Sequence, residues 1–123
     1  MMMGAQPAPE DLEARYQCGA KLRVEGQYEE AIQVLKLVLD AQPEFYQARH
    51  ELGLSLCYFG LFDESIIELE RVRDAAPEYL KARNDLGLTY AMLGMNDEAK
   101  AEFEFVLSKE PDNEIANKNI VYF

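Results

Sequence analysis

The single histidine, His50, and the two cysteines, Cys18 and Cys57, come closest to the nucleophilic or metal-binding groups of an enzyme. If His50 and Cys57 share a helix, they lie roughly 10 Å apart along its axis. That separation exceeds the hydrogen-bond reach that a thiol–imidazole pair needs. One turn after His50 stands Leu54, which cannot bind a metal. The sequence therefore predicts no catalytic residue, no metal site and no cofactor, and the chain is not expected to be an enzyme.

The acidic pairs and the glycines also favour structure over chemistry. The pairs Glu29-Glu30, Asp63-Glu64 and Asp97-Glu98 recur at the same interval, where helices are expected to begin. Acids at these places oppose the positive end of the helix dipole, which we favour over a cation site. The glycines recur 34 residues apart instead of clustering in a phosphate-binding loop.

A 34-residue repeat organises the chain. Residues 48–60 read ARHELGLSLCYFG, residues 82–94 read ARNDLGLTYAMLG, and residues 14–26 carry a weaker copy, ARYQCGAKLRVEG. Three columns are strictly in register: Gly19, Gly53 and Gly87; Gly26, Gly60 and Gly94; and Pro43, Pro77 and Pro111. A period of this size predicts stacked helix pairs that bury a continuous core.

Glycine, proline and apolar spacing predict seven helices. They are expected at residues 10–25, 28–41, 44–59, 61–75, 78–93, 96–108 and 112–123. The Gly26 column suits the left-handed conformation that ends a helix. Inside helices, Gly53 and Gly87 each cost roughly 1 kcal/mol against alanine, so close helix packing is expected there. Asp63, and Asn96 or Asp97, are expected to cap two helices.

These residues resemble the tetratricopeptide repeat, W-x2-L-G-x2-Y, then A-x3-F, then P. The third copy matches best, with Leu86, Gly87, Tyr90, Ala99, Phe103 and Pro111. The tryptophan is replaced by Arg15, Arg49 and Arg83. We expect their stems to lie along the packing surface with the charge in water.

The resemblance implies an all-α fold, a right-handed α-solenoid of antiparallel helix pairs. Residues 1–9 are expected to form a flexible tail, and the repeats to span 10–43, 44–77 and 78–111. Residues 112–123 are expected to form a closing helix.

The resemblance also implies a non-catalytic protein–protein interaction module whose concave groove binds a peptide segment or helix of a partner. The groove columns carry over to Tyr16, Phe45, Gln47, His50, Leu54, Cys57, Tyr58, Tyr79, Lys81, Asn84, Leu88 and Met92. Leu54, Leu88 and Met92 suit a core between helices equally well, whereas Tyr58 and His50 favour the groove.

Relatives that bind chaperone tails clamp a C-terminal carboxylate with lysine, asparagine and arginine side chains. The corresponding residues are Tyr16, Ala20, Glu51, Lys81 and Asp85, of which only Lys81 matches. Glu51 and Asp85 would repel a carboxylate. The sequence therefore predicts a neutral or basic ligand segment.

The net charge of −11 argues against nucleic-acid and anionic-membrane partners. The most apolar run, residues 52–62, is shorter than the ~20 residues that span a bilayer. The N-terminus does not have the pattern of a secretory signal. We expect a cytoplasmic protein with reduced, partly buried cysteines.

The C-terminus is apolar. Ile120 and Val121 are expected to pack on the third repeat, which leaves Tyr122 and Phe123 uncovered. Either a second copy covers them, or the next helix of a longer array does. The first alternative predicts a weak homodimer through the C-terminal helix, and a self-assembling scaffold is the alternative function.

Overall fold

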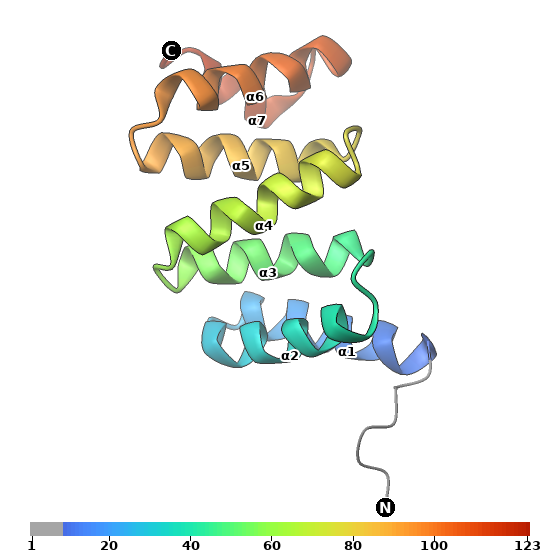
Figure 1. Cartoon of the computed structure of the whole chain (residues 1–123). Helices are drawn as coiled ribbons and strands as arrows, with labels where there is room; N and C mark the ends of the chain where they lie inside the picture. Colours follow the sequence, from blue (N-terminus) through green and yellow to red (C-terminus); the bar gives the residue numbers. More distant parts are fainter. Residues whose placement is uncertain (1–8) are drawn as a thin grey trace, which may run out of the picture.

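The computed structural model describes residues 9–123, and these residues form seven α-helices and no strand (Figure 1). The helices are α1 (Pro9–Val24), α2 (Tyr28–Ala41), α3 (Tyr46–Tyr58), α4 (Phe62–Ala75), α5 (Leu80–Met92), α6 (Asn96–Lys109) and α7 (Glu114–Ile120). The expected all-α fold is confirmed. Residues 1–8 of the expected tail lie outside the described residues, and Pro9 already begins α1.

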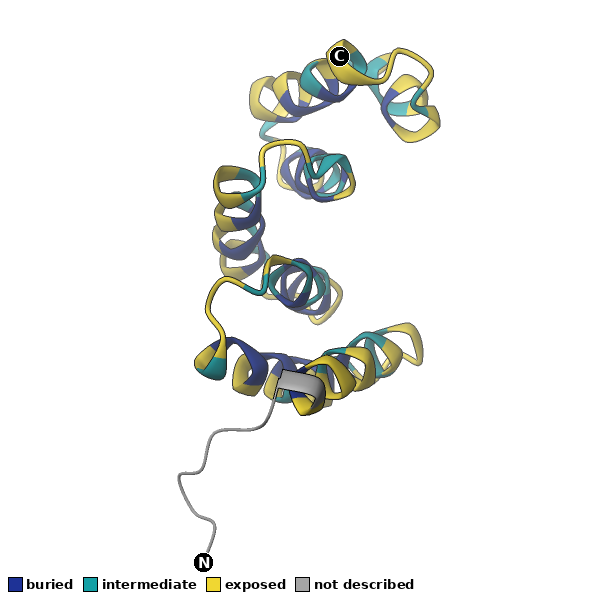
Figure 2. Cartoon of the chain, turned by 90° about the vertical axis from the view of Figure 1, so that its right-hand side faces the viewer, coloured by how far each residue is buried: buried dark blue, intermediate teal, exposed yellow. Residues whose placement is uncertain are grey.

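The helices stack as the pairs α1–α2, α3–α4 and α5–α6, with α7 against α6 (Figure 1). We call the contacts between successive pairs the first and second junctions, and that between the third pair and α7 the third junction. On one side of the stack, α1 packs on α3 and α3 packs on α5. On the other side, α3 lies between α2 and α4, and α5 lies between α4 and α6. The stack therefore bends into a C, with α1, α3, α5 and α7 along its concave inner side (Figure 2).

Glycines in the middle of α1, α3 and α5 let each helix approach its pair partner. A Cβ on Gly19 would lie 2.6 Å from Leu35, and one on Gly53 would lie 2.7 Å from Leu69. A Cβ on Gly87 would lie 2.8 Å from the Phe103 ring, and those three large side chains are fully buried. The expected close packing at the glycine column is confirmed. The glycines between paired helices are left-handed as expected, with φ of +83°, +92° and +76° at Gly26, Gly60 and Gly94.

The predicted helix caps are wrong. The N-cap positions of α4 and α6 are Leu61 and Met95, and neither makes a side-chain capping bond. The left-handed glycine before each N-cap starts the helix earlier, so Asp63 and Asp97 fall within the first turn. There they face the helix amides as acids. A side-chain cap occurs instead at Asn113, whose Oδ1 accepts from the backbone N–H at the start of α7 at 3.0 Å.

Two expectations for the C-terminal residues are wrong, those for Val121 and Phe123. Ile120 packs on the third-repeat core as predicted, but Val121 is 74% exposed. The helix ends at Ile120, so Val121 no longer follows the helical period. The final turn instead brings the Phe123 ring back to the Phe103 ring, with centroids 6.1 Å apart. Tyr122 is exposed, as expected.

Candidate peptide-binding surface

A row of exposed apolar side chains follows the inner side of the stack. Val24, Tyr58 and Met92 occupy the same repeat position at the ends of α1, α3 and α5, and they are 73%, 59% and 61% exposed. Leu54 and Leu88, one helical turn earlier on α3 and α5, are half-buried beside this row. We call these five residues the inner row.

The other predicted groove residues fall into two groups. Five that keep at least part of their surface accessible are Tyr16, Phe45, Gln47, Tyr79 and Lys81. His50, Cys57 and Asn84 are buried, each being less than a tenth exposed. Because so little of their surface is accessible, these three side chains offer a ligand little area to contact. The groove itself stays a prediction.

His50 is held between two side chains of the next repeat. Its Nδ1 lies 3.1 Å from the Tyr79 hydroxyl, and its Nε2 lies 2.6 Å from Asp85 Oδ2. The same Tyr79 ring meets the imidazole edge-on, with centroids 5.2 Å apart. Burial raises the pKa of Tyr79 to about 12. His50 therefore links α3 to the next repeat across the second junction.

The other two junctions use the same pair of repeat positions with different chemistry. At the first junction, Tyr16 and Phe45 pack ring to ring, with centroids 5.0 Å apart. At the third junction, Asn84 Nδ2 donates to Asn113 Oδ1 at 3.1 Å. Asn84 Oδ1 is buried without a protein partner. The repeat therefore determines where the contact forms, and the residue types determine whether it is apolar or polar.

A second inner contact also changes between junctions. Arg23 of α1 forms an ion pair with Glu51 of α3 at the first junction. One repeat later, the equivalent positions hold Cys57 and Asp85. Cys57 is buried and supplies no positive charge, and Asp85 bonds His50 instead.

Comparison with solved structures identifies the fold. The first TPR of Spaghetti (RPAP3), bound to the HSP90 peptide SRMEEVD, superposes with a TM-score of 0.88 at 23% identity, over 97% of this chain and 94% of that one. The TPR domain of Aspergillus fumigatus Sgt2 gives 0.85 at 18%, over 97% and 80%. This chain has the tetratricopeptide-repeat (TPR) fold. MamA from Desulfovibrio magneticus RS-1 gives 0.79 at 27%, over 86% of this chain and 60% of that one.

No protein-family model and no curated protein matches the sequence. The TPR assignment therefore concerns the fold: a right-handed solenoid of three repeats with a closing helix.

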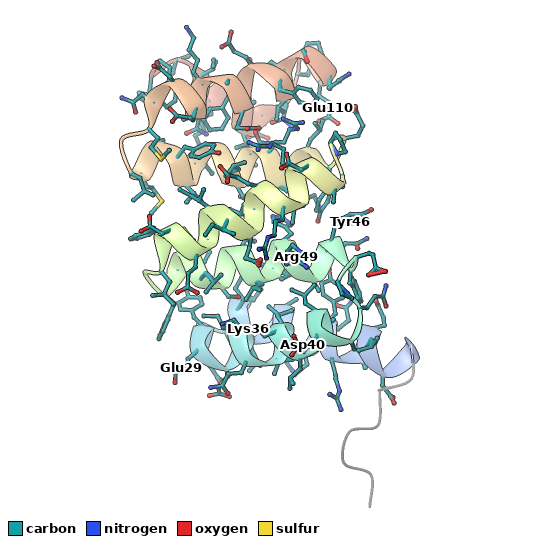
Figure 3. All side chains as sticks on the ribbon, viewed as in Figure 1. Glu29, Lys36, Asp40, Tyr46, Arg49 and Glu110 are labelled. Atoms are coloured by element: carbon teal, nitrogen blue, oxygen red, sulfur yellow. The ribbon has the colours of Figure 1, made fainter. Side chains whose placement is uncertain are left out.

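At the tryptophan position of the TPR pattern, the expectation for Arg49 is wrong. Its charge is not in water: Nη1 donates to the Glu68 carboxylate at 2.9 and 3.1 Å, and Nη2 donates to the Pro43 carbonyl at 2.8 Å. Glu68 is only 8% exposed and accepts a further bond from Arg71. Figure 3 shows Arg49 on α3 close to α4. A buried carboxylate needs such partners, so it draws the guanidinium inward.

In the third repeat, Arg83 stands at the tryptophan position and bonds in the same way as Arg49. Arg83 donates to Glu102 at 3.0 Å and to the carbonyl before α5 at 2.9 Å. In the first repeat, Val34 stands at the position that would hold the carboxylate, and Arg15 is exposed as expected. The sequence signal that could have revealed the inward arginines was the glutamate 19 residues after Arg49 and after Arg83.

The expectation that both cysteines are partly buried is wrong. Cys18 is exposed and Cys57 is buried. Within residues 9–123, no group of three histidine, cysteine, aspartate or glutamate side chains is placed to hold a metal ion. None of the helices in that part of the chain combines the length and apolarity needed to cross a membrane.

Proposed function

We propose that this chain is a non-catalytic interaction module that binds a peptide segment or helix of a partner protein along its inner side. The observation that carries the proposal is the inner row, in which the first helix of each of the three pairs exposes a large apolar side chain at one repeat position. Solvent-exposed apolar rows of this kind mark interaction sites more often than scattered apolar residues do. The HSP90 peptide in the RPAP3 structure is consistent with peptide binding by this fold.

We further propose that the bound segment is neutral or basic. The five positions of the carboxylate clamp hold two acids, Glu51 and Asp85, which already bond Arg23 and His50. Only Lys81 remains as an exposed cation among them. A carboxylate placed there would meet Lys81 and two carboxylates, of which Glu51 is already paired with Arg23.

The test is capture of a partner with the purified chain, followed by quantitative binding of that partner to variants. Met92→Ala should weaken binding at least several-fold while leaving the unfolding midpoint nearly unchanged, since exposed side chains contribute little to folding. Tyr58→Ala should weaken binding as well, but it also removes the stacking of Tyr58 on Tyr28, whose ring centroids lie 5.5 Å apart. Leu37→Ala is the matched control, because Leu37 is 55% exposed on α2, outside the inner row. Equal binding by all three variants would contradict the proposal.

A second candidate function is a scaffold that assembles through its C-terminal end. Ile115, Val121 and Tyr122 are 47%, 74% and 78% exposed at this end of the stack. Because like charges on two copies repel, added salt should favour such a dimer of a chain with net charge −11. Light scattering over a concentration series should show a mass that rises with salt. A monomer mass at high concentration in both low and high salt would exclude the dimer.

A further inference from the structure

The outer side of the stack carries a hollow between α2 and α4. Its volume is about 140 Å³, and its floor is formed by Leu52 and Leu56, which are 3% and 1% exposed. Ile67, which is 49% exposed, stands on its rim together with Lys36 and Arg71. Lys36 lies on the side of the molecule that carries α2 and α4 (Figure 3). This hollow is separate from the inner row.

The next repeat shows what fills the same place. Between α4 and α6, Tyr90 occupies the repeat position of Leu56, and it is 3% exposed. The Tyr90 hydroxyl donates to the Glu70 carboxylate at 2.5 Å. At the first junction, the shorter Leu56 leaves this place without a ring, and Lys36 stands at the position of Glu70. The hollow therefore lies beside the position at which the next repeat carries a buried aromatic ring.

Size and charge define the occupant. An enclosed cavity of about 150 Å³ lined by leucine, isoleucine and phenylalanine accepts a benzene ring, and this hollow has a similar volume but opens to solvent between charged residues. Glu70 places a negative charge beside Tyr90, whereas the equivalent residue beside the hollow, Lys36, is positive. Arg71 keeps 62% of its side chain exposed while bonding Glu68, whose charge is also met by Arg49. Glu64 is the remaining acid on the rim.

We propose that this hollow is a second docking site, which takes an aromatic side chain of a partner polypeptide with an acidic residue next to it. The ring rests on Leu52 and Leu56 against Ile67, and the neighbouring carboxylate meets Lys36 and Arg71. The site is independent of the inner side, so a partner can occupy either surface or both.

The probe is p-cresol, which is the tyrosine side chain without its backbone. In a nuclear magnetic resonance titration of the full chain, it should shift the methyl signals of Leu52, Leu56 and Ile67 saturably in the millimolar range. The capped tripeptide Asp-Tyr-Asp should bind the same site several-fold more tightly than Lys-Tyr-Lys. Absence of these shifts, or shifts confined to the inner row, would overturn the proposal.

Closing the hollow with the residues of the next repeat is the decisive control. The double variant Leu56→Tyr with Lys36→Glu supplies the ring and acceptor seen at Tyr90 and Glu70, so p-cresol shifts at Leu52 and Ile67 should disappear. Persistent shifts in a folded double variant would contradict a ring-sized site.

A second variant guards against misfolding of the first. Lys36→Glu alone changes an exposed residue, and it should reverse the preference between the two tripeptides. An unchanged preference would overturn the acidic part of the proposal. Concentration-dependent shifts at Leu56 without any probe would assign the hollow to a second copy of this chain instead of a partner.

Discussion

The first and second junctions are built at identical repeat positions and yet differ in kind. On the inner side, the first junction joins two aromatic rings, Tyr16 and Phe45, beside a permanent ion pair. The second junction replaces these with the buried contacts of His50 to Tyr79 and Asp85. The same pair of repeat positions thus holds an apolar contact at one junction and a polar contact at the next.

The outer sides of the two junctions differ in filling. Tyr90 places a buried ring at the second junction, whereas the first junction holds Leu56 at this position and carries the hollow above it. Packing in this repeat array is therefore decided junction by junction. At this position the first junction has leucine where the second has tyrosine, so one buried ring is missing beside the hollow.

The largest expected effect comes from making the second junction like the first. Tyr90→Leu should lower the free energy of unfolding by roughly 2–3 kcal/mol, because leucine retains part of what deleting a whole buried aromatic side chain costs, ~3–5 kcal/mol. Urea unfolding measures the change. The variant should also gain p-cresol shifts at Leu86, and an unchanged midpoint would show that the Tyr90 ring is not a packed part of the junction.

The glycine column offers a smaller test between repeats. Gly87→Ala should destabilise by up to ~2 kcal/mol, since overpacking costs about 1–3 kcal/mol and the gain in helix propensity returns about 1 kcal/mol. Gly53→Ala should cost less, because its added Cβ meets Leu69, which can rotate, whereas Gly87 faces the rigid ring of Phe103. Thermal unfolding of both variants decides the order, and a larger loss for Gly53→Ala would contradict it.

Alkaline pH should weaken the second junction in particular. Burial raises the pKa of Tyr79 and of Tyr90 from 10.0 to about 12. Because the folded state holds these protons more tightly, their stabilisation is complete below pH 10 and is lost as the pH rises towards about 12. At the first junction the equivalent residues, Phe45 and Leu56, do not ionise, although burial also raises the pKa of Tyr16.

The double variant Tyr79→Phe with Tyr90→Phe should therefore flatten the fall in unfolding free energy over this range. Chemical unfolding at a series of alkaline pH values measures the slope. If the slope equals that of the unchanged chain, the alkaline sensitivity lies outside the second junction.

The smallest expected effect is an absence of binding. Titration with the acidic peptide SRMEEVD should give no saturable heat, because both junctions present an acid, Glu51 or Asp85, at the positions that would clamp its carboxylate. Lys81→Ala should change nothing in this titration. Micromolar binding that Lys81→Ala abolishes would show instead that a single lysine suffices.

The order of residues along the chain was enough to predict the helix pairs, the close approach at the Gly53 column and the left-handed turns at the Gly60 column. These features depend on residues near one another in the chain or on a single column, and a 34-residue period displays both. Even so, the helix caps at Asp63 and Asp97 were predicted wrongly, because the left-handed glycine sets the first turn before a side chain can cap it.

Which side chains meet became known only from the packed helices. His50 bonds partners 29 and 35 residues away, and Arg49 turns to a carboxylate 19 residues away. Periodicity places residues in columns but does not say which columns touch, because that depends on the angle between helices and on the size of each side chain. For the same reason, neither the return of Phe123 to the core nor the hollow above Leu56 could be predicted before the helices were placed against one another.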